Sequence, residues 1–202
     1  MKNHKRVLVL TLWTCMLVVS GCTVQSNATH TPLKEEAKAN HFVAQEKLTQ
    51  TALVEYPYYE TPRDLYNSAD VIALVTVKEV ASKELNISAN KQSPHYLVYT
   101  VSRVKADQII KGDKEKTEFS VKQLGGDDGK TQLIVDNMIY LEKDKQYLLF
   151  LESYPDDKPM ALLNPKQAFI EVSGDAIVYK DPLFPDLDRD DFMEYIAALP
   201  HY

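Results

Sequence analysis

The run Leu124–Thr131, LGGDDGKT, ends in Gly-Lys-Thr and so invites comparison with a phosphate-binding loop. Such a loop needs a glycine where this chain has Leu124, and a helix after the Lys-Thr pair to present N–H groups to the phosphate. The residues that follow, Gln132–Val135, have the composition of a strand, and two consecutive aspartates would repel a polyanion. We therefore predict a polar turn that binds no nucleotide. Its candidate ligand-contacting residues are Gly125, Gly126, Asp127 and Asp128.

An acidic segment near the C-terminal end has side chains that suit a hard cation. Asp186, Asp188 and Asp190 match the first, third and fifth ligand positions of a calcium loop. The match then fails, because Asp191 stands where the turn glycine is required and Ala197 stands where a bidentate glutamate is required. The same acids also favour the start of a helix. A metal site at the first three aspartates and a helix cap are the two alternatives.

An aromatic cluster, Tyr56-Pro57-Tyr58-Tyr59, precedes the first predicted helix. Exposed rings of this kind stack on sugars or peptides, and Tyr56, Tyr58 and Tyr59 are therefore candidate ligand-binding residues. The alternative is that the cluster fixes the chain against the domain by packing.

Catalytic motifs that depend on histidine, serine or cysteine are absent from the sequence. His95 is the one histidine that belongs to the predicted folded core, and there is no His-Glu-x-x-His, Gly-x-Ser-x-Gly or Cys–His arrangement. We predict no catalytic residue and no cofactor. Hydrolysis by a pair of carboxylates stays open as an alternative, because the sequence does not show which acids meet in space.

The N-terminal residues have the pattern of a secretory signal. Basic residues precede the apolar run Val7–Val19, which is shorter than the roughly 20 residues of a membrane-spanning helix. The run ends in Val19-Ser20-Gly21-Cys22, which resembles the lipobox of bacterial lipoproteins. The resemblance implies cleavage between Gly21 and Cys22, removal of residues 1–21 and a diacylglyceryl group on the Cys22 thiol. Two acyl chains anchor a protein stably, so we expect it at the outer face of the cell membrane.

Cleavage would change the charge and the thiol chemistry. It would remove three of the 23 basic residues and none of the 29 acidic ones, leaving a net charge of −9. This charge argues against nucleic-acid partners, whose phosphates require a basic surface. Cys15 would also leave, so Cys22 would be the only cysteine and would carry lipid. A disulfide, a thiolate nucleophile and a cysteine-ligated metal are thereby excluded within one chain.

The rest of the chain divides into a polar tether, residues 22–50, and one domain, residues 51–202. In the domain, Thr61 and Pro62 begin a short helix, and a second helix covers Asp188–Leu199. Between them the period of apolar residues predicts a mainly β fold: a small OB-like closed or half-closed antiparallel barrel with one N-terminal and one C-terminal helix. The predicted strands are Val71–Val80, Tyr96–Val104, Glu118–Leu124, Gln132–Val135, Gln146–Tyr154, Ala168–Val172 and Ala176–Tyr179.

Four stretches in a fixed order resemble netrin-like domains, which contain the barrel of tissue inhibitors of metalloproteinases. They are Ser68–Val75, Tyr99–Val101 leading to Ile109–Gly112, Phe119–Val121 and Tyr147–Leu151. The resemblance implies an OB-type barrel and a general role in binding, although a fold alone assigns no function. Two features of the family do not carry over. After cleavage and lipidation, this chain would have no cysteine available for the family's disulfides. The inhibitors chelate zinc through a free N-terminal cysteine, whereas here that cysteine would carry lipid.

The sequence therefore predicts a non-enzymatic binding module held at the membrane through lipidated Cys22, with an unknown protein or cell-wall partner. The open face of an OB barrel and its loops are the expected binding surface, which directs attention to Gly125–Thr131 and Ser82–His95. Two alternatives stay open: a carboxylate- or metal-dependent envelope enzyme, and a calcium-dependent adhesion module.

Overall fold

The computed structural model describes residues 46–88, 93–155, 158–178 and 181–201. These residues all lie in one compact unit, Ala44–Tyr202. The helices are α1 (Pro62–Ser68), α2 (Arg189–Ala198) and the 3₁₀ helix η1 (Leu199–His201). The strands are β1 (Leu48–Ala52), β2 (Val71–Asn86), β3 (Tyr96–Lys111), β4 (Glu118–Leu124), β5 (Gly126–Asp127), β6 (Thr131–Val135), β7 (Gln146–Glu152), β8 (Met160–Leu162), β9 (Phe169–Ser173) and β10 (Ala176–Val178).

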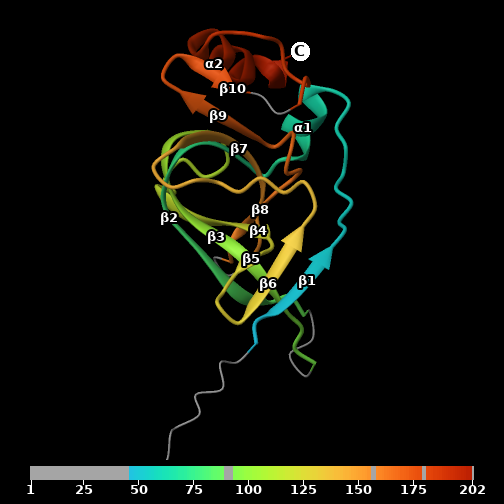
Figure 1. Cartoon of the computed structure of the whole chain (residues 1–202). Helices are drawn as coiled ribbons and strands as arrows, with labels where there is room; N and C mark the ends of the chain where they lie inside the picture. Colours follow the sequence, from blue (N-terminus) through green and yellow to red (C-terminus); the bar gives the residue numbers. More distant parts are fainter. Residues whose placement is uncertain (1–45, 89–92, 156–157, 179–180, 202) are drawn as a thin grey trace, which may run out of the picture. The chain divides into compact units, whose positions relative to one another are not determined.

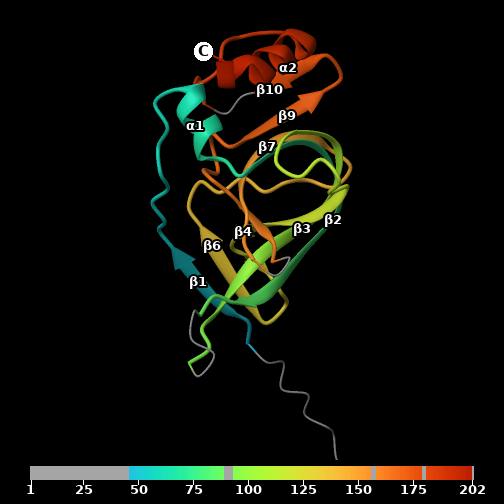
Figure 2. The ribbon, with the colours of Figure 1, turned by 180° about the vertical axis from the view of Figure 1, so that it is seen from behind.

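Five of the strands close into a barrel in the order β7-β2-β3-β4-β8. The ring closes because β8 pairs with two neighbours: it is antiparallel to β7 and parallel to β4. The other pairings within the ring are antiparallel, and β9 and β10 extend the sheet outward from β7. Figures 1 and 2 show the two helices with β9 and β10 at one end of the barrel, and β1, β5 and β6 at the other. The prediction of a mainly β fold with a small, closed or half-closed OB-like barrel and two helices is confirmed.

The β2–β3 hairpin is longer than the sequence predicts, because each strand has 16 residues. Its register shifts at three places, between Ile72 and Ala73, Leu74 and Val75, and Val77 and Glu79. Such irregularities bend a strand and increase its twist. A long strand needs this curvature to follow the wall of a small barrel. Gly112 follows the end of β3, and its φ of +108° is a conformation that favours glycine.

A second sheet, in the order β1-β6-β5, contains a strand that the predicted tether did not allow for. The strand β1 begins at Leu48, so regular structure starts before the predicted boundary at residue 51. It pairs in parallel with β6, and Lys47 beside it forms an ion pair with Asp127. Its sequence, LTQTA, has no alternation of apolar and polar residues. Four of its five residues are exposed. The backbone ladder to β6, rather than burial, holds this strand in place.

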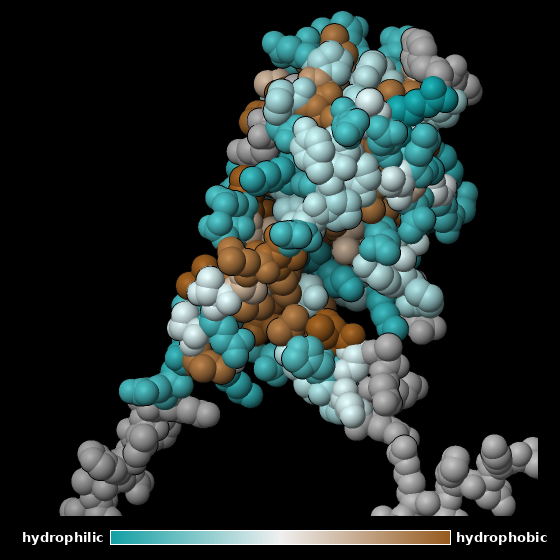
Figure 3. Space-filling model, turned by 90° about the vertical axis from the view of Figure 1, so that its right-hand side faces the viewer, coloured by the Kyte–Doolittle hydropathy of each residue, from teal (hydrophilic) through white to brown (hydrophobic). Residues whose placement is uncertain are grey.

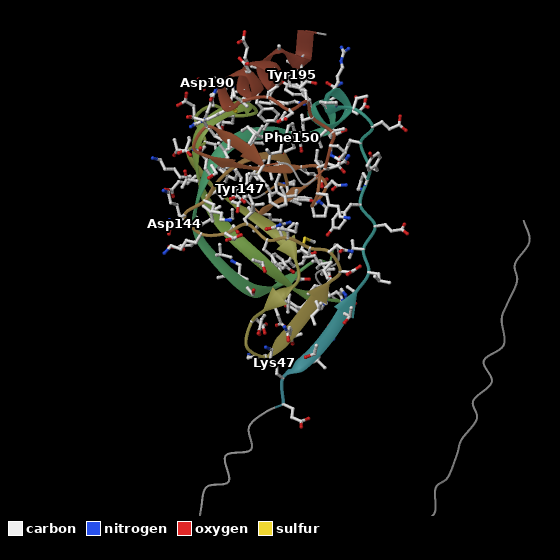
Figure 4. The ribbon with its side chains drawn as sticks, turned by 45° about the horizontal axis from the view of Figure 1, so that its top comes forward. Lys47, Asp144, Tyr147, Phe150, Asp190 and Tyr195 are labelled. Atoms are coloured by element: carbon white, nitrogen blue, oxygen red, sulfur yellow. The ribbon has the colours of Figure 1, made fainter. Side chains whose placement is uncertain are left out.

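Both predicted helices are present and are capped as expected. Thr61 Oγ1 accepts a hydrogen bond from the Asp64 N–H, and Pro62 occupies the first turn of α1. Asp188 caps α2, which covers β7 through aromatic contacts: Phe192 meets Phe184 edge-on, and Phe184 stacks on Phe150 at 5.8 Å. Figure 4 shows Tyr147 and Phe150 in the interior, with Asp144 and Asp190 at the periphery. The strand β7 is therefore buried on both faces, as predicted.

The residues that carry the predicted signal, cleavage site and lipid, including Gly21 and Cys22, lie outside the described residues, as does most of the predicted tether. Among the helices that are described, none has the length and apolar content needed to cross a membrane.

Candidate binding groove

The glycine-rich turn is a self-contained hairpin between β5 and β6. A strand follows the Lys-Thr pair, as predicted, so no helix end faces the loop. Asp127 accepts a hydrogen bond from the Gly129 N–H, and Asp128 accepts from the N–H groups of Lys130 and Thr131. These bonds hold the pKa of both carboxyl groups below the usual range, with the Lys47 ion pair as the largest cause at Asp127. The two carboxylates serve the turn itself, and no donor array for a phosphate exists among them.

Gly125 and Gly126 allow the turn to approach the barrel closely. Both have positive φ, +93° and +126°. A Cβ atom on Gly126 would clash with the hydroxyls of Ser82 on β2 and Thr100 on β3. The Thr100 hydroxyl already donates a hydrogen bond to the Gly125 carbonyl at 2.9 Å. These two glycines are therefore packing residues that join the second sheet to the barrel.

The acidic segment does not assemble into a metal site. Asp188 caps α2 by accepting a hydrogen bond from the Asp191 N–H. Within the described ranges, no three or more His, Cys, Asp or Glu side chains lie together closely enough to hold an ion. The structure thus assigns Asp188 to the helix start and does not bring Asp186 and Asp190 to it as ligands.

The structure fixes the backbone of the aromatic cluster against the domain and leaves one of its rings exposed. Its backbone is fixed by Gln167, which accepts a hydrogen bond from the Tyr59 N–H and donates one to the Tyr59 carbonyl, and by Asn164, which donates to the Pro57 carbonyl. Tyr59 packs against the main hydrophobic core. Tyr58, in contrast, is 70% exposed, and Tyr56 is partly buried at the wall of a groove.

This groove lies between the segment that follows β1 and the outside of the barrel. Its inner cavity has a volume of about 230 Å³, and an outer channel of about 610 Å³ continues from it past Val54, Tyr56 and Pro165, which line both. The face on which this segment runs, the right-hand side of Figure 1, carries a hydrophobic area in Figure 3. The inner cavity is lined by Val54, Tyr56, Tyr99, Lys122, Gln123, Leu124, Met138, Tyr154, Ala161, Leu162 and Pro165.

The position of the groove is that of the binding face of an OB barrel. In chain order the barrel strands are β2, β3, β4, β7 and β8, so Tyr99 lies on the second and Lys122 on the third. Tyr154 lies in the loop between the fourth and the fifth. OB barrels bind through their second and third strands together with the loops after the first and fourth. The groove therefore lies where OB barrels bind, and its inner lining includes none of the residues 125–131 and 82–95 that the sequence pointed to.

Lys122 is the one cation among the described residues that line the inner cavity, and two tyrosine rings lie near its ammonium. Its ammonium lies 4.0 Å from the centre of the Tyr154 ring and 5.9 Å from that of Tyr99. Among the described residues it forms no hydrogen bond and no ion pair. Burial is the main cause that lowers its pKa below the ordinary value; Glu152 opposes that effect, and Lys158 adds to it. The groove thus presents a partly buried positive charge that contacts no carboxylate among the residues that the structure describes.

Tyr154 provides the aromatic ring nearest to the Lys122 ammonium. Its hydroxyl donates a 2.6 Å hydrogen bond to Glu152, which fixes the ring beneath the Lys122 ammonium. Burial, followed by the hydrogen bond and the charge of Glu152, raises the pKa of Tyr154 far above its ordinary value. The phenol is therefore neutral at physiological pH and acts as a stacking surface and a hydrogen-bond donor.

The sequence identified Tyr56 and Tyr58 but not Tyr99, Lys122 or Tyr154. Tyr99 and Lys122 lie on neighbouring strands, since Thr100 pairs with Gln123 and Val101 with Lys122. The alternation of exposed and buried residues along β3 and β4 places both side chains outside the barrel. That alternation was the one signal in the sequence, and it does not distinguish a binding surface from an ordinary solvated face.

Replacing Gly126 by alanine tests the close approach of the turn, with Gly129→Ala as the matched control. Both positions have positive φ, so each alanine costs roughly 1–2 kcal/mol of backbone strain. A Cβ at Gly129 meets no atom within 4 Å, whereas one at Gly126 clashes with two hydroxyls. We expect Gly126→Ala to lower the free energy of unfolding in urea by about 1–3 kcal/mol more than Gly129→Ala. Equal losses would show that the turn does not contact β2 and β3.

Comparison with models of known protein families gave no match, and comparison with curated proteins gave no match either. The geometry of the groove and the chemistry of its lining are therefore the basis on which a function is proposed.

Proposed function

We propose that this protein is a lipid-anchored, extracytoplasmic binding module whose ligand occupies the groove between the β1-proximal segment and strands β3 and β4. The observation that supports this proposal most strongly is the placement of Lys122 over Tyr154 and Tyr99 at an open groove. Tyrosine rings and a partly buried cation bind ligands by stacking and by charge interactions. The netrin-like resemblance of the sequence points to the same general role.

The side chains and backbone that form the groove are held in place by hydrogen bonds, so the proposed binding surface is preorganised. The segment that forms its outer wall is held on both sides: β1 pairs with β6 before it, and Gln167 and Asn164 fix Pro57 and Tyr59 after it. Tyr154 is oriented by its hydrogen bond to Glu152. A surface whose side chains are already oriented loses less conformational entropy when a ligand arrives.

The groove wall begins about 30 residues after the proposed lipid-anchor residue Cys22. This short separation along the chain fits a binding site close to the membrane surface. The proposed lipid is on Cys22, the first described strand starts at Leu48, and the groove wall starts at Leu53. The lining that faces outward at this point includes Leu53, which is 86% exposed. A partner protein or cell-wall component near the membrane is the ligand source that this arrangement serves.

The anchor is tested by Cys22→Ser, with Cys15→Ser as the matched control. If Cys22 carries the lipid, its replacement blocks acylation and moves the protein out of the detergent phase on Triton X-114 partitioning. Cys15→Ser should leave partitioning unchanged, because that residue departs with the signal. Membrane retention of Cys22→Ser, or an unmodified Cys22 thiol by mass spectrometry, would contradict the anchor.

Binding in the groove is tested by a photocrosslinking residue in living cells. Tyr58→p-benzoylphenylalanine places the probe at an exposed position on the outer channel, and the same residue at Val178, 38% exposed on β10, is the control. We expect a discrete adduct from position 58 that is lost when Tyr99→Ala is added and is not formed from position 178. No adduct at 58, or the same adducts at both positions, would contradict a binding role for the groove.

A further inference from the structure

The size of the inner cavity limits what enters it. Its volume of about 230 Å³ is smaller than the 300–1,000 Å³ of typical small-molecule sites. The cavity therefore receives one group about the size of a large side chain, and the remainder of the ligand lies in the outer channel. The lining suits an aromatic or large apolar group, because Tyr56, Tyr99 and Met138 contribute rings and a thioether.

The charge of the cavity selects an anion with a single negative charge. Lys122 provides one ammonium without an ion-pair partner in the described part of the chain, which complements a carboxylate. A phosphate dianion fits less well, because Lys122 is the one charged side chain among the described residues that line the inner cavity. The charges of Glu152 and Lys158 act on Lys122 with opposite signs, since Glu152 raises its pKa and Lys158 lowers it. The chain as a whole is also acidic, with a net charge of −6.

The wall of the groove offers backbone groups to a ligand. Residues Val54, Glu55 and Tyr56 follow β1 outside any strand, and their N–H and C=O groups make no hydrogen bond with other described residues. Unpaired backbone next to a pocket is the arrangement by which proteins bind an extended peptide: main-chain hydrogen bonds give affinity, and the pocket gives specificity. This feature favours a polypeptide over a free aromatic acid.

We infer that the groove binds the C-terminal end of a polypeptide whose last residue is aromatic or large and apolar. The terminal carboxylate pairs with Lys122, the last side chain enters the cavity beside Tyr99 and Tyr154, and the preceding residues run along Val54–Tyr56. This inference rests on the proposed function of the groove as a binding site, and adds to it the chemical class of the ligand.

The test compares two peptides that differ only in the charge of the chain end. Acetyl-Gly-Gly-Gly-Phe with a free carboxylate and the same peptide with a C-terminal amide are titrated by calorimetry into the intact protein, purified in detergent. We expect the free acid to bind at least about tenfold more tightly, which corresponds to about 1.4 kcal/mol. N-acetylphenylalanine, which keeps the carboxylate and lacks the preceding backbone, should bind more weakly than the tetrapeptide acid.

The variant Lys122→Gln should abolish the preference for the acid, whereas Lys105→Gln, an exposed lysine on the same sheet, should retain it. The pKa of Lys122, followed by NMR of its side-chain carbons, should rise when the acid is added and stay unchanged with the amide. A lysine with a purely structural role would show no such difference.

Equal binding of acid and amide, binding of neither, or a preference that survives Lys122→Gln would overturn the inference. The acid–amide comparison uses the unaltered protein, so it holds even if a variant fails to fold. A groove-dependent photoadduct in cells together with equal binding of the two peptides would leave the proposed function standing and refute only this ligand class. Absence of the photoadduct would refute the proposed function itself.

Discussion

The rest of the structure depends on the double pairing of one very short strand. Met160–Leu162 forms β8, which pairs with β4 through Val121↔Met160 and Lys122↔Ala161 and with β7 through Leu151↔Leu162. Without it, β4 would be an open sheet edge with unpaired backbone groups. Closure satisfies those groups and brings the loop that carries Tyr154 alongside Lys122. The binding groove is therefore a consequence of the way in which the barrel closes.

The state of Lys122 follows from two opposing effects. Cation–π contacts stabilise an ammonium by about 0.5–1 kcal/mol at exposed sites and by about 2 kcal/mol when it is desolvated. Burial lowers the pKa of Lys122, the charge of Glu152 raises it, and the charge of Lys158 lowers it. In the proposed site, an anionic ligand would add a stabilising charge beside the ammonium. The pKa of Lys145, in contrast, is raised by its pairing with Glu142 and Glu171. Lys122 has no such carboxylate contact among the described residues.

Local sequence signals predicted the elements that depend on local physics. Thr61-Pro62 gave the start of α1, and the apolar run QYLLFLE gave the buried strand β7. The positive φ of the glycines agrees with the predicted turns. Strands β1, β5 and β8 were missed, because LTQTA has no apolar period and the other two have only two and three residues. Strands β1 and β8 exist through pairing with residues far away in the chain, which no local pattern records.

The contrast between local sequence patterns and long-range pairing also explains which groove residues the sequence predicted. Tyr56 and Tyr58 were found because they form a cluster in the sequence, whereas Tyr99, Lys122 and Tyr154 are each unremarkable in their own segments and meet only through strand register and barrel closure. Gly125 and Gly126 were candidates for ligand contact, and the structure shows both packed closely against neighbouring side chains. Asp188 was a candidate metal ligand, and its short side chain caps a helix.

The most direct test of this account is the NMR chemical shift of the Lys122 side chain. An ammonium held 4.0 Å above the centre of the Tyr154 ring brings the adjacent ε-methylene protons into the shielding region of that ring. We expect upfield ε-proton resonances for Lys122 that return to ordinary lysine positions in Tyr154→Leu. Ordinary positions in the unaltered protein would show that barrel closure does not place this cation over the ring, and the groove would lose its proposed recognition group.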